Sequence, residues 1–331
     1  IAKSDRGETP GGTDEDSPPR VGIVVLHWNR VEETRRCIQS LSRLRYQCFH
    51  VFLVDNGSDI PLDNRISEDF QGLSIIRSSE NLGFAGGCNL GIRASAEDGC
   101  DFVWLLNNDA VVDPDALRHL VEVAEERSAC GIVGSTILEY DNRQIVNHIG
   151  GQINPYSGLT VHLGKGEPYP SSAAKNGLPV SFVTGCSMLA RLRMIRDVGL
   201  MDEGYFLYWE DVDWCVRARR KGWDIAVAYN SLVYHKSSSS VGYGSPLKSY
   251  YVARNSIRFI WKLYPWLFPL SIAWWPRQHL LNHIVRGRFV HARMSIRALF
   301  DALFRRVIVP QGGQGDIKAA KKTVIHSESY L

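Results

Sequence analysis

The 331-residue sequence predicts an α/β protein: an open sheet flanked by helices, followed by a C-terminal helical extension. Three observations support this prediction. Apolar runs alternate with segments of helical periodicity through roughly the first 130 residues. Polar residues follow several of the apolar runs at the point where each run ends. The composition becomes basic and aromatic from about residue 250.

Continuous apolar runs in the first half predict strands that are buried on both faces. Segments whose apolar residues recur every three or four positions predict the helices between them. Pro114 suits the first turn of the last of these helices, and Asp113 is expected to cap it. In chain order, we expect strand 21–29, helix 32–44, strands 50–58 and 73–78, helix 81–97, strand 101–110 and helix 113–127.

The second half of the chain is less regular. The sequence predicts strands at 130–140 and 158–164, a strand running into a helix over 181–199, a helix at 211–222 and a strand at 223–235. We expect one domain over 21–245. The polar leader 1–20 lacks the apolar stretch of a signal peptide and is expected to be disordered, and the polar tail 310–331 is expected to be flexible.

Cysteine usage and charge exclude several classes of protein. The seven cysteines occur singly, which argues against a disulfide framework or a cysteine zinc site and for a reducing cytoplasm. A net charge of +3 is too small to imply nucleic acid as a partner. The sequence has no Walker A motif, and its GFAGG stretch lacks the G-x-G-x-x-G spacing of dinucleotide-binding folds.

The stretch VWLLNNDAVVDPDAL places Asn107, Asn108 and Asp109 at the end of a buried strand. Ligands of open α/β sheets bind beyond the carboxyl ends of the strands. A carboxylate beside two amides offers oxygen ligands for a divalent cation, although a capped turn also favours Asn and Asp. The ends of neighbouring strands carry Asn29, Asp55 and Asn56, so we expect one shared site.

The stretch GYFLYWEDVDW places Glu210, Asp211 and Asp213 after an apolar, aromatic run. Mutual repulsion and burial raise the pKa of clustered carboxylates, as the function of a general base requires. A helix N-terminus also favours acids, and this explanation stays open for Asp213. His235 ends the following strand and is a candidate metal ligand.

The sequence resembles the inverting nucleotide-sugar glycosyltransferases of family 2 over about residues 21–240. Six regions in the same order carry this resemblance: VGIVVLHWNR, VDNGS, ENLGFAGGCNLGI, LLNNDAVVDPDAL, VTGCSMLARLRMIRDVGLMDEGYFLYWEDVDW and the region of His235. The resemblance implies the GT-A fold, a Rossmann-like open twisted mixed sheet flanked by helices. VDNGS, NLGFAGGCN and NND are most similar to the branch that contains bacterial rhamnosyltransferases and galactofuranosyltransferases.

The resemblance also implies roles for residues. Asp109 would hold Mg²⁺ or Mn²⁺ on the donor diphosphate, with His235 as a further ligand, and N-N-D supplies fewer carboxylates than the family's D-x-D motif. Asp211 would be the general base, supported by Glu210. The nucleotide-binding residues, in half 21–130, would be Asn29, Asp55, Asn56, Asn81, Gly83, Asn89 and Asn108. In half 131–245, the sugar or acceptor would contact Gly185, Tyr208 and Trp209; for the last two, core packing is the alternative.

The implied reaction transfers a sugar, with inversion, from a nucleoside-diphosphate sugar to a glycan or a polyprenyl-diphosphate-linked glycan. An Asn side chain both donates and accepts hydrogen bonds, so Asn56 is compatible with a pyrimidine base and hence with dTDP-rhamnose or a UDP-sugar. The alternatives are a galactofuranosyl-type transferase and a degenerate protein that binds nucleotide sugar or glycan without turnover.

The segment 246–309 is rich in Arg, Trp, Tyr and Phe, with Asp301 as its only acid. Its apolar stretch is interrupted by Lys262, Pro265 and Pro269, so we expect helices that lie on an anionic membrane surface rather than span it. Packing on the domain or formation of a homodimer is the alternative. We expect a peripheral protein on the cytoplasmic face of the cell membrane. His279 and His283 lack the glutamate of a zinc protease motif.

Overall fold

The computed structural model describes residues 17–63, 66, 70, 72–154, 156, 159–169, 178–236, 244–304 and 306–310. Most of the predicted leader and nearly all of the predicted tail lie outside the described residues. Arg20, the last residue of the predicted leader, bonds to the sheet domain: its backbone N–H donates to Asp101 at 2.8 Å and its guanidinium donates to Asp98.

The predicted α/β alternation in the first half is confirmed. Four parallel strands form one side of the sheet in the order β4-β1-β2-β3. In this register His27, at the end of one strand, pairs with Asp55 on the next, so the polar strand ends lie side by side. The elements are β1 (Val21–His27), α1 (Val31–Leu41), β2 (Phe49–Asn56), β3 (Leu73–Ser78), α3 (Gly83–Glu97), β4 (Phe102–Asn107), β5 (Ala110–Val112) and α4 (Ala116–Glu126).

The second half makes the sheet mixed, as predicted. β11 runs antiparallel to both β4 and β6, and β12 runs parallel to β6. The complete order is β10-β12-β6-β11-β4-β1-β2-β3, with β5 paired to β12 and β7 to β6. The added elements are β6 (Cys130–Glu139), β7 (Val146–His148), β10 (Leu178–Pro179), β11 (Ser187–Arg191), α5 (Leu192–Val198), η2 (Glu203–Tyr205), α6 (Glu210–Arg220) and β12 (Asp224–His235), with β8 (Gly151–Asn154) and β9 (Leu159–His162) as a separate pair.

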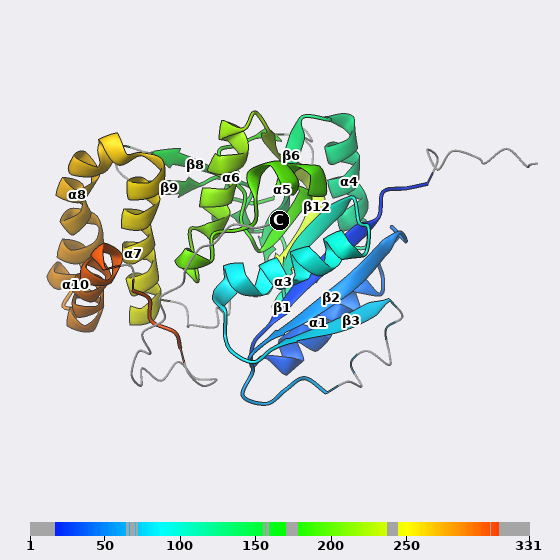
Figure 1. Ribbon diagram of the computed structural model, residues 1–331, viewed down its shortest axis with the longest axis horizontal. Coiled ribbons are helices and arrows are strands. Elements are labelled where there is room, and N and C mark those ends of the chain that lie inside the picture. Colours follow the sequence, from blue (N-terminus) through cyan, green and yellow to red (C-terminus); the bar gives the residue numbers. More distant parts are fainter. Residues whose placement is uncertain are drawn as a thin grey trace, which may run out of the picture.

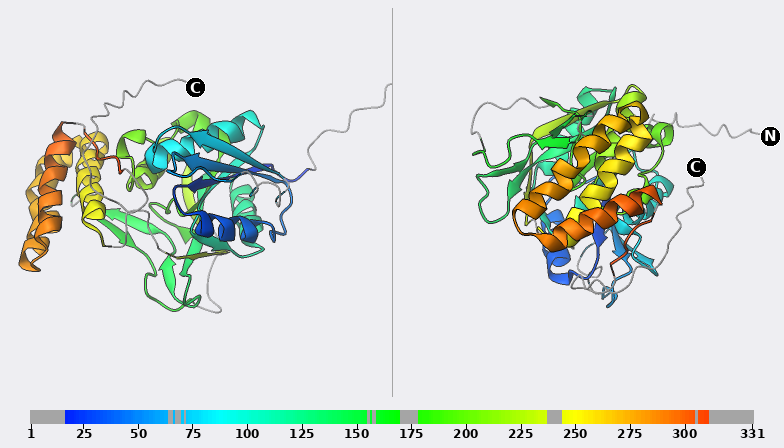
Figure 2. Two further views of the ribbon diagram at one scale, coloured as in Figure 1. Left: turned by 90° about the horizontal axis from the view of Figure 1, so that it is seen from below. Right: turned by 90° about the vertical axis from the view of Figure 1, so that its left-hand side faces the viewer.

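Helices cover both faces of the sheet, as Figures 1 and 2 show. Successive residues of β1 enter opposite cores: Ile23 and Val25 belong to the core that includes residues of α1 and α4, and Val24 belongs to the core that includes residues of α3, α5 and α6. This two-sided burial explains why the strands are continuous apolar runs in the sequence.

One predicted helix cap is wrong. α4 begins at Ala116 rather than beside Asp113, and Asp115 occupies its N-cap position without a side-chain cap bond. The Asp113 carboxylate instead accepts a hydrogen bond from the backbone N–H of Asp115 at 3.0 Å. An Asx-type turn of this kind competes with capping, so the helix starts later.

The C-terminal segment forms helices at one end of the sheet domain, and α7 lies between that domain and the later helices (Figures 1 and 2). Ser245 caps α7, accepting a hydrogen bond from the Lys248 N–H at 3.2 Å. The lone acid Asp301 is buried and accepts a hydrogen bond from Tyr250 at 2.8 Å. The elements are α7 (Pro246–Leu263), η3 (Pro265–Leu267), α8 (Phe268–Pro276), the π-helical η4 (Arg277–Leu281), α9 (Asn282–Val285) and α10 (Phe289–Leu303).

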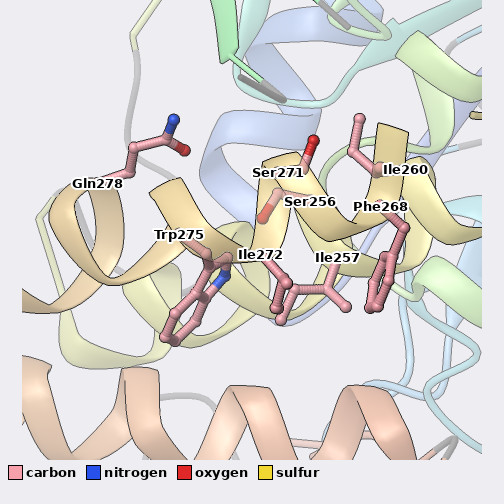
Figure 3. Close-up of a pocket in the computed structure, with 8 residues that line it drawn as sticks. All are labelled: Ser256, Ile257, Ile260, Phe268, Ser271, Ile272, Trp275 and Gln278. Atoms are coloured by element: carbon pink, nitrogen blue, oxygen red, sulfur yellow. The ribbon is translucent and has the colours of Figure 1, made fainter. Parts of the chain in front are cut away.

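A narrow pocket separates α7 from α8 (Figure 3). Trp275 lines it, and its indole N–H donates to the Ala253 carbonyl at 3.1 Å, which ties α8 to α7. None of the helices among the described residues has both the length and the apolar character needed to cross a bilayer.

Candidate active site

The strand ends bring Asp109 and His235 together, although 126 residues separate them in sequence. Asp109 lies in the turn between β4 and β5, and His235 is the last residue of β12, which pairs with β5. The imidazole Nε2 lies 2.9 Å from the Asp109 carboxylate. Burial alone would lower the pKa of His235, but the neighbouring Cys186 and Asp109 side chains raise it well above its ordinary value.

The Asp109–His235 pair offers ligands of the right chemical type for a divalent cation, but two ligands are too few to hold one. A carboxylate and an imidazole are ordinary ligands of Mn²⁺, and Mg²⁺ typically uses one or two carboxylates together with substrate phosphates. Among the residues that the structure describes, no three His, Cys, Asp or Glu side chains gather into a ready-made metal site. Asp109 and His235 therefore suit a cation whose remaining ligands come from water and a bound diphosphate.

Asn107 and Asn108 point to different partners. The Asn107 amide lies 3.4 Å from His235 Nε2, at the candidate metal site. The Asn108 amide donates to the Thr34 hydroxyl of α1 at 2.9 Å, and that hydroxyl lies 2.7 Å from the ring of His27. Burial lowers the pKa of His27 to about 4, so its ring is neutral at pH 7. Asn108 thus fixes the turn against α1.

Asp211 lies in the first turn of α6, and its surroundings suit a base. Its carboxylate accepts hydrogen bonds from the backbone N–H groups of Gly185 (3.0 Å) and Val212 (2.8 Å). Burial raises its pKa and these two N–H groups lower it; the net shift is upward. A half-buried carboxylate that two backbone donors hold in place is oriented to accept a proton.

A short hydrogen-bonded backbone segment links the two candidate acids, Asp211 and Asp109. Gly185, which holds Asp211, is followed by Cys186, whose carbonyl accepts a hydrogen bond from the Asn107 backbone N–H at 3.0 Å. Asn107 lies two residues before Asp109. One short backbone segment therefore links the turn that carries Asp109 with the first turn of α6, which carries Asp211.

Glu210 and Asp213 differ from Asp211 in their partners. Glu210 is 4% exposed, and its Oε2 atom has no hydrogen-bond partner in the described part of the chain. Burial and the neighbouring Asp211 raise the pKa of Glu210 well above its ordinary value. Asp213 instead pairs with Arg217 (2.6 Å) and Lys262 (2.9 Å), which gives it a structural role.

Asp55 and Asn56, which are predicted to bind the nucleotide, hold neighbouring loops through their side chains. The Asp55 carboxylate accepts from the backbone N–H groups of Ser58 and Leu62, at 3.2 and 3.1 Å. Asn56 accepts from the Leu82 N–H at 3.0 Å and donates to Gly83 and Asn81. Both side chains are buried, and contact with a base stays a prediction.

The other predicted nucleotide residues also shape the rim of the site. Asn29 has a φ of 56° and its amide bonds to Asp59. The side-chain oxygen of Asn81 accepts a hydrogen bond from the Gly83 N–H. Gly83 has a φ of 74°, and a Cβ atom there would lie 2.4 Å from the Phe206 carbonyl oxygen. Only glycine suits that position. Asn89 is buried and binds the backbone of Met201 through both ends of its amide, joining α3 to the second half.

The predicted sugar contacts have mixed surroundings. A Cβ at Gly185 would lie 2.8 Å from the ring of Phe84, so the backbone approaches closely there. Trp209 is 7% exposed and its ring lies 4.9 Å from that of Phe259, which favours core packing. Tyr208 is half-buried, so a sugar contact remains open for it.

Comparison with known proteins decides the family. Residues 18–249 match the family described as Glycosyltransferase like family 2. The chain belongs to glycosyltransferase family 2. Its similar relatives include the low-salt glycan biosynthesis hexosyltransferase Agl10 of Haloferax volcanii, 25% identical over 62% of this chain and 63% of that protein. They also include the dTDP-rhamnosyl transferase RfbF of Shigella flexneri, 24% identical over 72% of this chain and 79% of that protein.

A third relative is the N-acetylglucosaminyl-diphospho-decaprenol L-rhamnosyltransferase of Mycobacterium tuberculosis, 24% identical over 66% of this chain and 76% of that protein. Solved structures share the fold of this family-2 glycosyltransferase. The mannosyltransferase PcManGT of Pyrobaculum calidifontis is 13% identical, with a TM-score of 0.54 over 90% of this chain and 91% of that one. S. aureus TarS 1–349 in complex with UDP-GlcNAc is 16% identical, with a TM-score of 0.55 over 86% of this chain and 81% of that one. The predicted GT-A fold and enzyme class are confirmed.

Replacing Glu210 by Gln should leave transfer by this family-2 enzyme within about tenfold of wild type. Burial raises the pKa of Glu210 well above its ordinary value and its Oε2 atom has no hydrogen-bond partner among the described residues, so a neutral amide of the same size is a close substitute. Steady-state kcat with a fixed donor and acceptor measures this. A loss as large as that of Asp211→Asn would show that the enzyme needs an ionised Glu210.

Two residues next to the site were missed by the sequence reasoning. Asn255 and Arg254 of α7 are buried and donate to backbone carbonyls of residues 204–208. Their only signal is the polar stretch ARNS between the apolar, aromatic residues of YYV and IRFIW.

Proposed function

We propose that this family-2 glycosyltransferase moves a sugar from a nucleoside-diphosphate sugar to a glycan or lipid-linked glycan, with inversion at the anomeric carbon. One observation carries the proposal: the half-buried Asp211, with its raised pKa, and the Asp109–His235 pair are linked by one short hydrogen-bonded backbone segment. A general base linked in this way to a diphosphate-binding pair suits an in-line displacement.

In the proposed step, Asp211 accepts the proton of the acceptor hydroxyl. The acceptor oxygen forms a bond to the anomeric carbon while the bond from that carbon to the diphosphate oxygen breaks. The bonding pair leaves with the nucleoside diphosphate. The N–H groups of Gly185 and Val212 keep the carboxylate oriented during proton transfer.

Asp109 and His235 would hold Mg²⁺ or Mn²⁺ on the diphosphate. A bound divalent cation supplies positive charge that offsets the charge developing on the leaving group. Asn107, next to His235, would replace a carboxylate of the usual motif, so we infer that metal affinity depends on the donor.

We infer a pyrimidine donor, dTDP-rhamnose or a UDP-sugar. The dTDP-rhamnosyl transferase among the relatives supports the first, and the TarS complex with UDP-GlcNAc supports the second. A calorimetric screen of UDP-, dTDP- and GDP-sugars, each with and without Mn²⁺, followed by transfer assays, tests the function. Binding without transfer to any acceptor would favour the degenerate binding protein, and a preference for GDP would refute the pyrimidine inference.

A polyprenyl-diphosphate-linked acceptor is the one we favour, since a relative is named for such an acceptor and the helical extension carries exposed apolar and cationic side chains. Val285 is 85% exposed, Phe289 70% and Trp266 68%. The exposed arginines of α8–α10 and their connections are Arg277, Arg286, Arg288, Arg293 and Arg297. Aromatic and basic side chains together fit an anionic bilayer surface, and a cytoplasmic, peripheral enzyme is the corresponding location.

Replacing Arg286 and Arg288 by Glu should lower binding to vesicles of anionic lipid by at least about tenfold, because each basic residue near such a surface contributes about 1 kcal/mol. Flotation with anionic and with neutral vesicles measures this. The matched control reverses Arg36 and Arg43, exposed residues of the sheet domain, and should float as wild type does. Equal flotation of both variants would refute the proposal that this surface binds the membrane. Concentration-dependent dimers without flotation would indicate that a second copy of the chain covers it.

A further inference from the structure

The loop before Glu210 has a backbone conformation that its residues rarely adopt. Phe206, Tyr208 and Trp209 all have positive φ, at 66°, 67° and 79°. Aromatic residues avoid this region because the Cβ atom crowds the backbone, so a surrounding structure must hold it. Trp209 is also the N-cap residue of α6, whose first turn carries Asp211. The conformation of this loop therefore sets the position of the candidate base.

The holding contact comes from α7. Asn255 is fully buried, and its side-chain amide nitrogen donates to the carbonyls of Tyr205 (2.9 Å), Leu207 (2.8 Å) and Tyr208 (2.8 Å). Arg254 fixes the other end of the amide, donating to the Asn255 carbonyl oxygen at 2.6 Å. The two N–H hydrogens of one side-chain amide are thus shared among three carbonyls of the loop, of which that of Tyr205 also accepts from the Leu207 backbone N–H at 2.8 Å.

The next turns of α7 bind the same region by charge. Arg258 donates to both oxygens of Asp202 at 3.0 Å, and Lys262 bridges Asp202 (2.7 Å) and Asp213 (2.9 Å). Residues 255, 258 and 262 recur at helical spacing, so one face of α7 holds both the loop and the first turns of α6.

We propose that Asn255 is a positioning residue for the transfer reaction: through three carbonyls it fixes the turn that orients Asp211 against Gly185. The helical extension is then part of the catalytic apparatus and not only a means of attachment. This inference rests on the proposed function, since it assumes that Asp211 is the base.

The test compares Asn255→Ala with Ser256→Ala in the full-length protein. Ser256 is the next residue and is also buried; its hydroxyl donates to the Ala253 carbonyl of its own helix and lies 3.3 Å from the ring of His279. We expect Asn255→Ala to lower kcat by about tenfold to 100-fold, because small displacements of a reacting group cost that much. The Kd for the donor should stay within about twofold: the loop bonds to the nucleotide half through the Phe206 carbonyl, which accepts from the Phe84 N–H at 2.6 Å, and Asn255 binds other carbonyls of the loop. Ser256→Ala should match wild type in both measurements.

A pH profile separates positioning from general destabilisation. In Asn255→Ala the acid limb of kcat should move to lower pH, because a loosened loop exposes Asp211 and removes the burial that raises its pKa. A lower kcat with an unmoved limb, or an unchanged kcat, would overturn the inference. If Asn255→Ala does not fold, Asn255→Ser, which keeps one donor, takes its place with the same criteria. If the wild-type protein transfers no sugar, the proposed function fails instead.

Discussion

Replacing Asp211 by Asn should reduce kcat by about 10²–10⁴-fold and leave the Kd for the nucleotide sugar within a few-fold of wild type. The amide matches the carboxylate in size but cannot accept the acceptor's proton, and general-base catalysis contributes a factor of this order. Transfer assays at saturating donor and acceptor, together with calorimetry of donor binding, measure the two quantities separately.

The pH dependence of the same reaction is a second test of the role of Asp211. Transfer needs ionised Asp211, and burial raises its pKa, so wild-type activity should fall as pH drops through a value above the ordinary aspartate range. Residual activity of Asp211→Asn should lack this limb. Asp213→Asn is the matched control: it weakens the pairs with Arg217 and Lys262, so it should lower Tm, reduce kcat far less than Asp211→Asn does and keep the acid limb. Unchanged kcat in Asp211→Asn would refute the base assignment.

Replacing Asp109 by Asn should reduce Mn²⁺- or Mg²⁺-supported transfer by about 10²–10³-fold, the usual cost of losing a group that stabilises developing charge. His235 would remain as the one charged or imidazole ligand of the pair. Calorimetry should find donor binding to wild type strengthened by the cation and donor binding to the variant unaffected by it.

The chain offers a gain-of-function control at the same strand end. Asn107→Asp restores a second carboxylate beside His235 and should tighten donor-dependent Mn²⁺ binding. Identical metal responses of Asp109→Asn and wild type would show that the cation, if used, binds elsewhere.

The sequence was sufficient to predict the parallel side of the sheet, because residues such as Val24 and Val25 enter two different cores and leave a continuous apolar run. It was also sufficient to predict that Asn107–Asp109 end a strand beside other polar strand ends. The meeting of Asp109 with His235 depends on β12 crossing to β5, and only the resemblance to a family implied it.

Other features depend on contacts that no local pattern encodes. Asn56 and Asn89 occupy positions that resembled nucleotide contacts, yet their amides bind loop backbone and Met201. The contact between Asn255 and the loop spans about fifty residues of sequence, and for its helix the composition left membrane contact, packing on the domain and dimer formation all open. The Asp113 cap failed because the side chain found a nearer backbone donor in its own turn.

The most direct measurement is a crystal structure of Asp211→Asn with an intact nucleotide sugar and Mn²⁺. The account predicts Mn²⁺ bound to Asp109 and the diphosphate, with residue 211 next to the face of the anomeric carbon that points away from the leaving group. A sugar bound beyond reach of residue 211, or a cation without contact to Asp109, would contradict it.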